Sequence, residues 1–208
     1  MVFTGSTARR ALALASITLS AGVAAGASAT PARAGLGISC PNPTAQVFAP
    51  WSDYANYAYA PDGGVELGAS GWKLAGTAGV AKGNESFAVH SKSDRYSLAL
   101  PAGSSATTPA MCIGLLSGHM RFFLQNSGSA SSRLRVQALY VGGTGAVLGV
   151  LDVGYLSAGA AWQPSPNVTM LGGLLPLLTQ GVQFKFSPAD STGNWRIDDV
   201  YVDPLKHT

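Results

Sequence analysis

The sequence predicts an all-β fold, an antiparallel β-sandwich of jelly-roll type, and two observations carry this prediction. Short apolar or alternating runs follow one another along the chain, separated by turn-forming Gly, Pro, Asn and Ser. Helical periodicity is almost absent, because the best helical candidate, residues 170–180, is interrupted by Gly172, Gly173 and Pro176. About ten strands fit a jelly roll better than a smaller immunoglobulin-like sandwich.

The predicted strands are short and closely spaced. They cover 65–67, 72–75, 86–90, 97–100, 111–115, 120–125, 134–141, 147–155, 163–170, 182–187 and 195–202. Turn sequences lie between them, such as Pro-Asp-Gly-Gly at 61–64 and Gly-Gly-Thr-Gly at 142–145, and these residue types supply the backbone angles that tight turns require. No repeat or linker divides this part of the sequence, so we expect one domain over 51–208.

The first 34 residues have the order of a secretory signal peptide. Arg9 and Arg10 form a cationic start, and residues 11–27 form an apolar run of Ala, Leu, Ile and Val. Small-residue cleavage motifs follow within 27–34. The apolar run is interrupted by Ser, Thr and Gly, and no later segment of the sequence is long enough and apolar enough to span a bilayer. We therefore expect a secreted protein without a membrane span.

The positive charge of the whole chain comes from this leader. Of the 13 basic residues, Arg9, Arg10 and Arg33 lie in the leader, and none of the 10 acidic residues does. The rest of the chain therefore carries equal numbers of basic and acidic residues. A nucleic-acid-binding protein needs a basic stripe that survives processing, and the sequence shows none.

The two cysteines, Cys40 and Cys112, follow the leader. In an oxidising compartment two cysteines most simply form a disulfide, which here would fasten a Pro- and Gly-rich N-terminal arm over 35–50 to the body of the domain. Two buried free thiols or a metal site are the alternatives. The sequence has no histidine or further cysteine at ligand spacing, so the disulfide is the favoured interpretation.

The chain offers few residues for catalysis. Its histidines are His90, His119 and His207, its glutamates are Glu66 and Glu85, and it contains no Gly-x-Ser-x-Gly elbow, His-Glu-x-x-His helix or phosphate-binding glycine loop. Carboxylates that are distant in sequence can still meet in space, as in glycoside hydrolases. A small secreted hydrolase therefore stays an open hypothesis, although the composition favours a protein that is not an enzyme.

The closing run of the domain, residues 194–204 (Asn-Trp-Arg-Ile-Asp-Asp-Val-Tyr-Val-Asp-Pro), combines strand-forming residues with three carboxylates. Successive side chains of a strand point to opposite faces. An unbroken strand would place Asp198 on one face and Asp199 on the other, each among apolar residues, so we expect at least one of them to lie close to the core.

A calcium ion is one way to stabilise such a carboxylate. Oxygen atoms of Glu66, Asp198 and Asp199 could enclose the ion, because the first and last strands of a jelly roll commonly meet and calcium takes six to eight oxygen ligands. In the alternative, Asp198 faces solvent, while Asp199 pairs with Arg196 or accepts backbone N–H groups. A β-bulge at Asp198 and Asp199 would also let the strand change faces without burying either acid.

Aromatic side chains are the candidates for ligand binding. The densest cluster, in the sequence Trp-Ser-Asp-Tyr-Ala-Asn-Tyr-Ala-Tyr, is interrupted by polar residues, which favours an exposed surface over a core. Its members are Trp51, Tyr54, Tyr57 and Tyr59. Further candidates are the rings of Tyr140, Tyr155 and Trp162, with polar partners such as Gln137, Arg121 or Asp53. The alternative for any one of these rings is ordinary packing, whereas Trp72 and Trp195 are expected in the core.

Two segments at the ends of this region carry a resemblance to known proteins. Glu66, Gly68 and Trp72 match an opening pattern of the type Asn-x-x-Phe-Glu-x-Gly-x-x-x-x-Trp, although Val65 replaces the aromatic residue and the Asn is missing. The Ile-Asp-Asp-Val sequence at 197–200 matches the closing strand. The chain thereby resembles secreted calcium-containing jelly-roll carbohydrate-binding modules and, more broadly, galactose-binding-like domains.

The resemblance frames about residues 60–204, with its specific part at the two ends. It implies a jelly roll, a structural calcium that fixes strand ends, and a surface that binds sugar. The chain is also similar to uncharacterised secreted actinobacterial proteins that share segments of the "LPAGSSATTP" and "WRIDDVYVDP" type, which implies location but no activity.

The function that the sequence predicts is a secreted, non-catalytic binding module. Its expected ligand is an extracellular polysaccharide or a cell-wall glycan. A structural or adhesive cell-surface protein is the alternative, and the small hydrolase is the second alternative. An exposed aromatic row with polar flanks is expected of the binding module, a large apolar patch of the adhesive protein, and two facing carboxylates in a cleft of the hydrolase.

Overall fold

The computed structural model describes residues 1–2, 45–112, 118–170 and 179–203. The predicted leader, apart from its first two residues, and most of the segment 170–180 lie outside these ranges. Cys40 also lies outside them, so its pairing with Cys112 stays a prediction, although Cys112 is not a free thiol. In the described part of the chain, no helix is long and apolar enough to cross a membrane.

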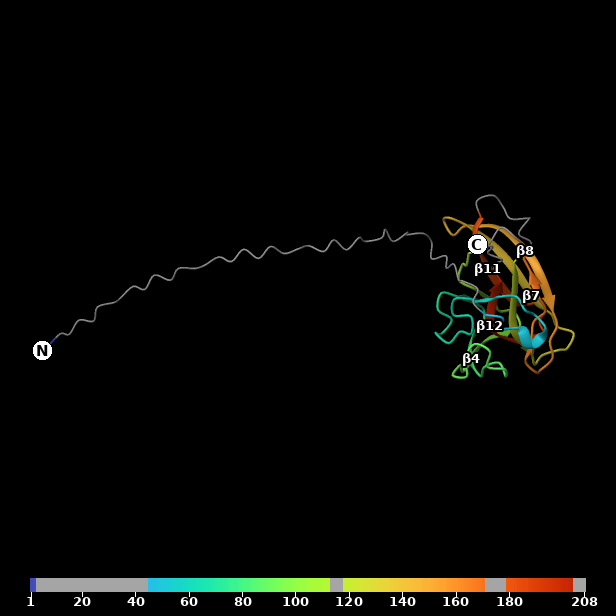
Figure 1. Ribbon diagram of the computed structural model, residues 1–208, viewed down its shortest axis with the longest axis horizontal. Coiled ribbons are helices and arrows are strands. Elements are labelled where there is room, and N and C mark those ends of the chain that lie inside the picture. Colours follow the sequence, from blue (N-terminus) through green and yellow to red (C-terminus); the bar gives the residue numbers. More distant parts are fainter. Residues whose placement is uncertain (3–44, 113–117, 171–178, 204–208) are drawn as a thin grey trace. The chain divides into compact units, whose positions relative to one another are not determined.

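Two antiparallel sheets form a β-sandwich of jelly-roll type, which confirms the predicted fold class (Figure 1). One sheet has seven strands. Its main path runs β10 (Val168–Thr169), β6 (His119–Asn126), β12 (Asn194–Asp203), β4 (Tyr96–Pro101) and β3 (Gly79–Lys82), while β1 (Ala58–Tyr59) pairs with β12 and β9 (Gln163–Pro164) pairs with β6.

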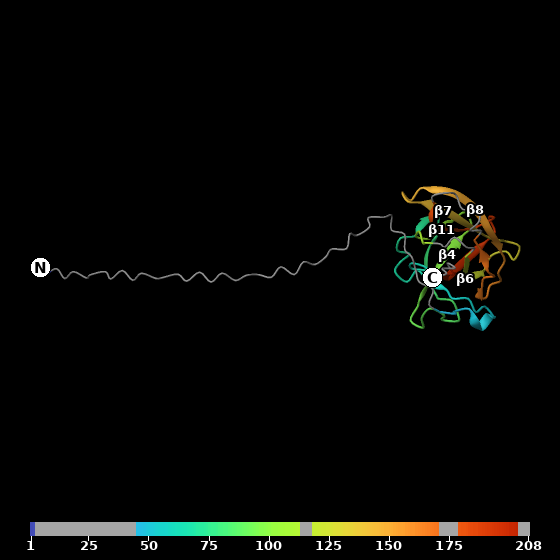
Figure 2. The ribbon, with the colours of Figure 1, turned by 45° about the horizontal axis from the view of Figure 1, so that its top comes forward.

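The second sheet has five strands. Their order is β2 (Lys73–Ala75), β5 (Ser105–Thr107), β11 (Thr179–Pro188), β7 (Leu134–Gly142) and β8 (Val147–Leu156). In Figure 2, β7, β8 and β11 lie above β4 and β6, so the two layers can be told apart. Among the described residues, the only helical element is a short 3-10 turn, η1 (Ala49–Trp51).

The main core fills the space between the two sheets. Alternate residues of the long strands point into it, so that Phe122 of β6 and Phe186 of β11 are fully buried and their rings meet edge to face at 5.1 Å. Trp72 and Trp195 are buried in the same cluster, as predicted. Burial of large apolar side chains on both inner faces is the main source of stability in such a sandwich.

A second apolar cluster covers the outer face of the seven-stranded sheet. Phe123 and Tyr201 point away from the main core, and the segment that precedes β1 brings Phe48 and Tyr57 onto them. The Phe48 ring lies 5.0 Å from Tyr57, 5.6 Å from Phe123 and 5.7 Å from Tyr201. Arg121 fixes this segment, because its Nη1 lies 2.8 Å from Asp53 Oδ2 in a largely buried ion pair.

Two strand predictions are wrong. Residues 65–67 lie in a loop with turns, because the Asp62 carboxylate accepts hydrogen bonds from the N–H groups of Leu67, at 2.9 Å, and Ser70, at 2.6 Å. Residues 86–90 form a loop around the Glu85 carboxylate. Local side-chain bonds of this kind compete with strand pairing.

Further segments differ from the predicted strands in length or position, and the short strands β1 and β5 were not predicted. Residues 163–170 form two short strands, β9 and β10, rather than one, since proline removes a ladder donor within the segment. Strand β3 was not predicted, because its four residues include only one large apolar side chain, Val80. Of the predicted strand 111–115, Met111 and Cys112 are described, and Met111 forms only an isolated bridge to Val182.

Candidate functional site

A β-bulge interrupts the closing strand where two acidic residues follow each other. Asp198 pairs with Phe123 of β6 and Tyr201 pairs with Arg121, so β12 has one more residue than its partner between these two pairs. Asp199 adopts a left-handed backbone conformation with φ of 48°. On its other side, β12 pairs with β4 only as far as Ile197 and resumes pairing with β1 at Tyr201. The bulge therefore faces the gap between two partner strands.

Both bulge carboxylates are buried and hydrogen-bonded. Asp198, 1% exposed, accepts the N–H of Glu85 at 2.8 Å and that of Asp199 at 2.9 Å. Asp199, 0% exposed, accepts the His90 N–H at 3.0 Å and the Tyr59 hydroxyl at 3.2 Å. The bulge considered from the sequence is present, but it buries both acids instead of exposing them. The part of the alternative that has Asp199 accept backbone N–H groups is confirmed.

The carboxylates at the bulge are poorly compensated in charge. Within the described ranges, neither forms an ion pair with a lysine or arginine, and Arg196 instead donates to the backbone carbonyls of Lys82 and Gly83, each at 2.7 Å. Burial raises the pKa of Asp198 to about 9, and the negative charge of Asp199 adds to this shift. Burial also raises the pKa of Asp199 to about 6, against the hydrogen bond from His90. A proton or a cation at the pair is therefore favourable.

The same acids position two loops. Asp198 and Asp199 hold the backbone of the 83–95 loop through Glu85 and His90, and the buried Glu85 carboxylate accepts the N–H groups of Phe87 and, at 2.6 Å, Val89. The 60–72 loop approaches from the other side. A Cβ at Gly64 would lie 2.9 Å from Asp199 Oδ1, so only glycine lets this backbone pack against the carboxylate.

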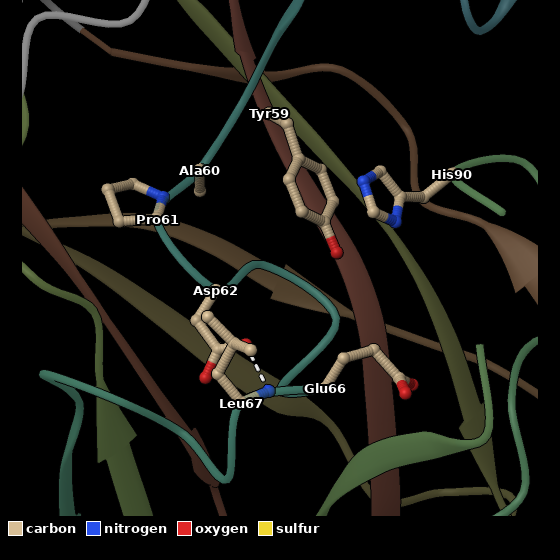
Figure 3. Close-up of a pocket in the computed structure, with 7 residues that line it drawn as sticks. All are labelled: Tyr59, Ala60, Pro61, Asp62, Glu66, Leu67 and His90. Carbon is tan, nitrogen blue, oxygen red and sulfur yellow. Dashed lines mark hydrogen bonds between the residues drawn. The ribbon is translucent and has the colours of Figure 1, made fainter. Parts of the chain in front are cut away.

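A pocket of about 460 Å³ opens between these two loops (Figure 3). Seven residues line it: Tyr59, Ala60, Pro61, Asp62, Glu66, Leu67 and His90. The Tyr59 and His90 rings are stacked, with their centroids 3.9 Å apart and their planes 3° from parallel. In Figure 3, Glu66 lies below this ring pair. The Glu66 Oε1 accepts the N–H groups of Arg95 at 2.8 Å and Tyr96 at 2.7 Å, so this glutamate ties the two loops together.

The structure groups possible metal ligands differently from the sequence prediction. The predicted set was Glu66, Asp198 and Asp199. In the structure Asp199 joins His90 and Asp94, whose ligand atoms all lie within 4.8 Å of one another. The oxygen atoms of Asp94 and Asp199 suit calcium, whereas an imidazole nitrogen suits zinc and other transition metals better. Because the carboxylates lack a lysine or arginine partner in the described chain, the site fits a divalent cation in charge.

The outer face of the five-stranded sheet is a second candidate site. One register row crosses all five strands on this face, and every member is polar: Lys73 pairs with Thr107, Thr107 with Lys185, Lys185 with Gln137, and Gln137 with Asp152. We call these five residues the polar row. The strand neighbours of Lys185, Gln137 and Asp152 point into or pack against the core, so these three residues face outward. Thr107 is only 8% exposed, so the row is open to solvent mainly at Lys73 and from Lys185 to Asp152.

An aromatic ring lies beside this row. Tyr155 on β8 is 54% exposed and pairs with Arg135 on β7, next to Gln137 and Asp152. Arg135 binds Asp152 through two hydrogen bonds, at 2.8 and 3.0 Å, and the Tyr155 hydroxyl donates to Asp152 at 3.3 Å. The hydrogen bond from Arg135 lowers the pKa of Asp152, so this carboxylate is ionised at neutral pH. The polar groups are thus held in place around the ring.

The four rings predicted for ligand binding lie on the opposite sheet or in the segment before it. Tyr54 is 67% exposed, while Trp51 and Tyr59 are half-buried. Tyr57 is 1% exposed in the second apolar cluster, and its hydroxyl donates to Asp53 at 2.8 Å. Trp51 packs edge to face on Phe87 and Phe123. Most of this cluster therefore contacts protein, and the dense aromatic sequence is used largely for packing.

Sequence reasoning named Tyr155 and Gln137 but missed their partners. Arg135 and Asp152 stand at outward positions of two strands that were predicted correctly, so the alternation in these strands could have placed them on the same face. Their pairing required the register of β7 and β8, which shifts at two points. Asp94 and His90 were missed as neighbours of Asp199 because residues 86–90 were predicted as a strand.

Comparisons with known proteins give a likeness in fold. No protein-family model matches the chain, and no curated protein matches its sequence. Among solved structures, the enzymatically active domain of tailspike protein 4 from bacteriophage CBA120 matches with a TM-score of 0.52 and 12% identity. The match covers 71% of this chain and 21% of that one, so the chain spans about a fifth of the length of that domain.

Two smaller structures match over nearly their whole length. The CBM22-1 xylan-binding domain of Paenibacillus barcinonensis Xyn10C gives a TM-score of 0.49 at 14% identity, covering 73% of this chain and 99% of that chain. TmCBM61, in complex with β-1,4-galactotriose, gives 0.45 at 17% identity, covering 69% and 96%. The match with a TM-score above 0.5 shows that the chain is similar in fold to part of the tailspike domain.

Proposed function

We propose that the protein is a secreted, non-catalytic binding module for an extracellular polysaccharide or cell-wall glycan, and that it binds this glycan on the outer face of the five-stranded sheet. The observation that carries the proposal is the polar row with Tyr155 beside it. Secretion is supported by the signal-peptide pattern of the first 34 residues.

The chemistry of this face matches that of a sugar chain. A pyranose ring has an apolar C–H face, which can stack on the exposed Tyr155 ring, and a rim of hydroxyl groups that both donate and accept hydrogen bonds. Gln137 offers a donor and an acceptor, Lys185 offers donors, and Asp152 offers acceptors beside the ring. The row runs across five strands, which is a longer path than a single small ligand needs.

The face is also organised before any ligand arrives. The two-point bond between Arg135 and Asp152 fixes two side chains that would otherwise lose conformational freedom on binding. An exposed ion pair of this kind adds little to the free energy of unfolding. Its contribution is to orient acceptors beside Tyr155, which lowers the entropic cost of binding.

A structural calcium ion is part of the proposal. The ion would lie at the β12 bulge, bound through oxygen atoms of Asp199 and its neighbours, and would offset the charge that burial leaves uncompensated. Its role would be to hold the 60–72 and 83–95 loops on the sheet. Two sets of ligands are possible, and both contain Asp199. The set predicted from the sequence adds Glu66 and Asp198, and the group seen in the structure adds His90 and Asp94.

The first prediction concerns the sugar face. Tyr155→Ala is expected to weaken binding to a soluble glycan about tenfold, because it removes the stacking surface and a bond to Asp152. Affinity electrophoresis in xylan, β-1,4-galactan and soluble cell-wall glycan provides the readout. Tyr54→Ala is the matched control, since this tyrosine is also exposed but belongs to the predicted aromatic cluster, and it should bind like wild type. Loss of binding in the control alone, or no binding of any of these glycans by wild type, would refute the proposed site.

The second prediction concerns pH in the presence of EDTA. Because folding raises the pKa of both carboxyl groups, the folded state binds their protons more tightly than the unfolded state does. Proton binding therefore stabilises the folded state fully below the ordinary carboxyl pKa of 3.8, and this stabilisation is lost as pH rises. The melting temperature should therefore fall as pH rises through about 6, where Asp199 titrates, and further toward about 9, where Asp198 titrates.

Asp199→Asn keeps the shape of the side chain without its charge, and its amide can donate to the Tyr59 hydroxyl. This variant should lose the fall in melting temperature near pH 6, whereas the exposed Asp190→Asn should keep it. A wild-type melting temperature that rises through this range would contradict the assignment of buried, uncompensated carboxylates.

The third prediction concerns the cation. Calcium added after EDTA at pH 8 should raise the melting temperature by several degrees, since a ligand that binds only the native state stabilises it, and Asp199→Asn should abolish the rise. Glu66→Gln should abolish it if the predicted oxygen set binds the ion, and His90→Gln if the group with Asp94 binds it. An unchanged melting temperature in metal-free wild type would remove calcium from the proposal.

A further inference from the structure

A second pocket lies at the base of the 83–95 loop. Its volume is about 470 Å³. The lining residues are Lys82, Gly83, Asn84, Asp94, Arg95 and Tyr96, and we call it the basic pocket. It is formed where the end of β3 pairs with the start of β4, through Lys82 and Tyr96, so its walls are set by strand pairing.

Two cations at this pocket have no ion-pair partner among the described residues, although carboxylates of Asp94 and Glu66 lie near them. Lys82 and Arg95 are exposed, and among the described side chains neither forms an ion pair with a carboxylate. The pocket's acid, Asp94, is engaged elsewhere, because its Oδ2 lies 2.7 Å from His90 Nδ1. Two cations are thus available to a ligand, and the Asp94 carboxylate beside them already has a partner.

A third cation stands behind the pocket wall. The Arg196 guanidinium donates to the carbonyls of Lys82 and Gly83, each at 2.7 Å, and packs so closely on Gly83 that a Cβ there would lie 3.3 Å from two of its nitrogens. Arg196 has no carboxylate partner in the described ranges. Its charge adds to those of Lys82 and Arg95 and is offset in part by that of Asp198.

One polar group of the pocket lacks a partner. The Asn84 side chain donates through Nδ2 to the Glu85 carbonyl at 3.2 Å, but its Oδ1, which is buried in the pocket wall, accepts no hydrogen bond from any described residue. An amide oxygen in this position is stabilised when a ligand supplies a donor such as a hydroxyl group. The pocket thus offers cations for an acidic group and an acceptor for a hydroxyl.

We propose that the basic pocket binds an acidic sugar unit, with its carboxylate between Lys82 and Arg95 and a neighbouring hydroxyl donating to Asn84. A sugar acid carries both groups on one ring, whereas a simple anion such as acetate carries only the first. The inference rests on the proposed function in taking the ligand to be a saccharide, but it concerns a site on the other sheet and can succeed or fail separately.

The test uses oligogalacturonate, a chain of carboxyl-bearing sugars, and its neutral methyl ester, measured by calorimetric titration of the mature protein. The variant Lys82→Gln/Arg95→Gln should weaken oligogalacturonate binding about tenfold or more, since charge-assisted hydrogen bonds are lost. Lys92→Gln/Arg133→Gln removes the same charge from exposed residues that do not line the pocket and should bind like wild type.

Asn84→Ala should weaken the binding of oligogalacturonate without changing how that binding depends on salt, which separates the hydroxyl contact from the charge contact.

Three results would overturn the inference. They are an equal loss in both double variants, which would indicate only a long-range charge effect; a methyl ester that binds as tightly as the acid; and acetate that competes as well as galacturonate, which would indicate a simple anion site. Melting curves of each variant identify any loss that is due to unfolding. Binding of neutral glycan by Tyr155→Ala is measured in parallel, so that failure of the sheet face and failure of the basic pocket give different patterns.

Discussion

The two buried carboxylates at the bulge of β12 are the constraint on which the loop architecture depends. Asp198 and Asp199 accept hydrogen bonds from Glu85, His90 and Tyr59. They thereby fix the 83–95 loop, which lines the basic pocket and contributes His90 to the pocket beside Tyr59. Carboxylates placed here raise the free energy of the folded state when they are charged. That cost is reduced by several N–H donors, by protonation, or by a bound cation. Since protonation and cation binding depend on the solution, the stability of the domain depends on pH and on cation concentration.

The outer faces of the two sheets differ in their exposure to solvent. The outer face of the seven-stranded sheet is covered by the segment that carries Phe48 and Tyr57, and the Arg121–Asp53 ion pair holds this segment in place. The outer face of the five-stranded sheet has Arg135, Asp152 and Tyr155 in view of solvent. The seven-stranded sheet is the covered one because the aromatic residues Phe48 and Tyr57 lie in the segment that packs on it. The open face is the one that we propose binds glycan.

Much of the fold could be predicted from the sequence, because the long strands β6, β7, β8, β11 and β12 are rich in strand-forming residues, with clear alternation in β7, and pack into one core. The candidate sites were harder to predict from the sequence. Asp198 and Asp199 were recognised as candidates for burial, but their partners His90 and Glu85 lie on a loop whose shape depends on side-chain bonds to those same acids. The row from Lys73 to Asp152 depends on the register of five strands, and register is a tertiary property that no local pattern encodes. Tyr57 was misleading because a polar-flanked tyrosine can use its hydroxyl internally, here toward Asp53.

The measurement that tests the central claim most directly is the map of backbone amide shifts of the isotope-labelled mature protein as a binding glycan is titrated by NMR. The account predicts that the largest changes fall on β7, β8 and β11, centred on Gln137, Asp152 and Tyr155, with little change at Tyr54 or Trp51. Changes confined to residues 51–59, or spread evenly over the surface, would contradict the assignment of the five-stranded sheet as the glycan-binding face.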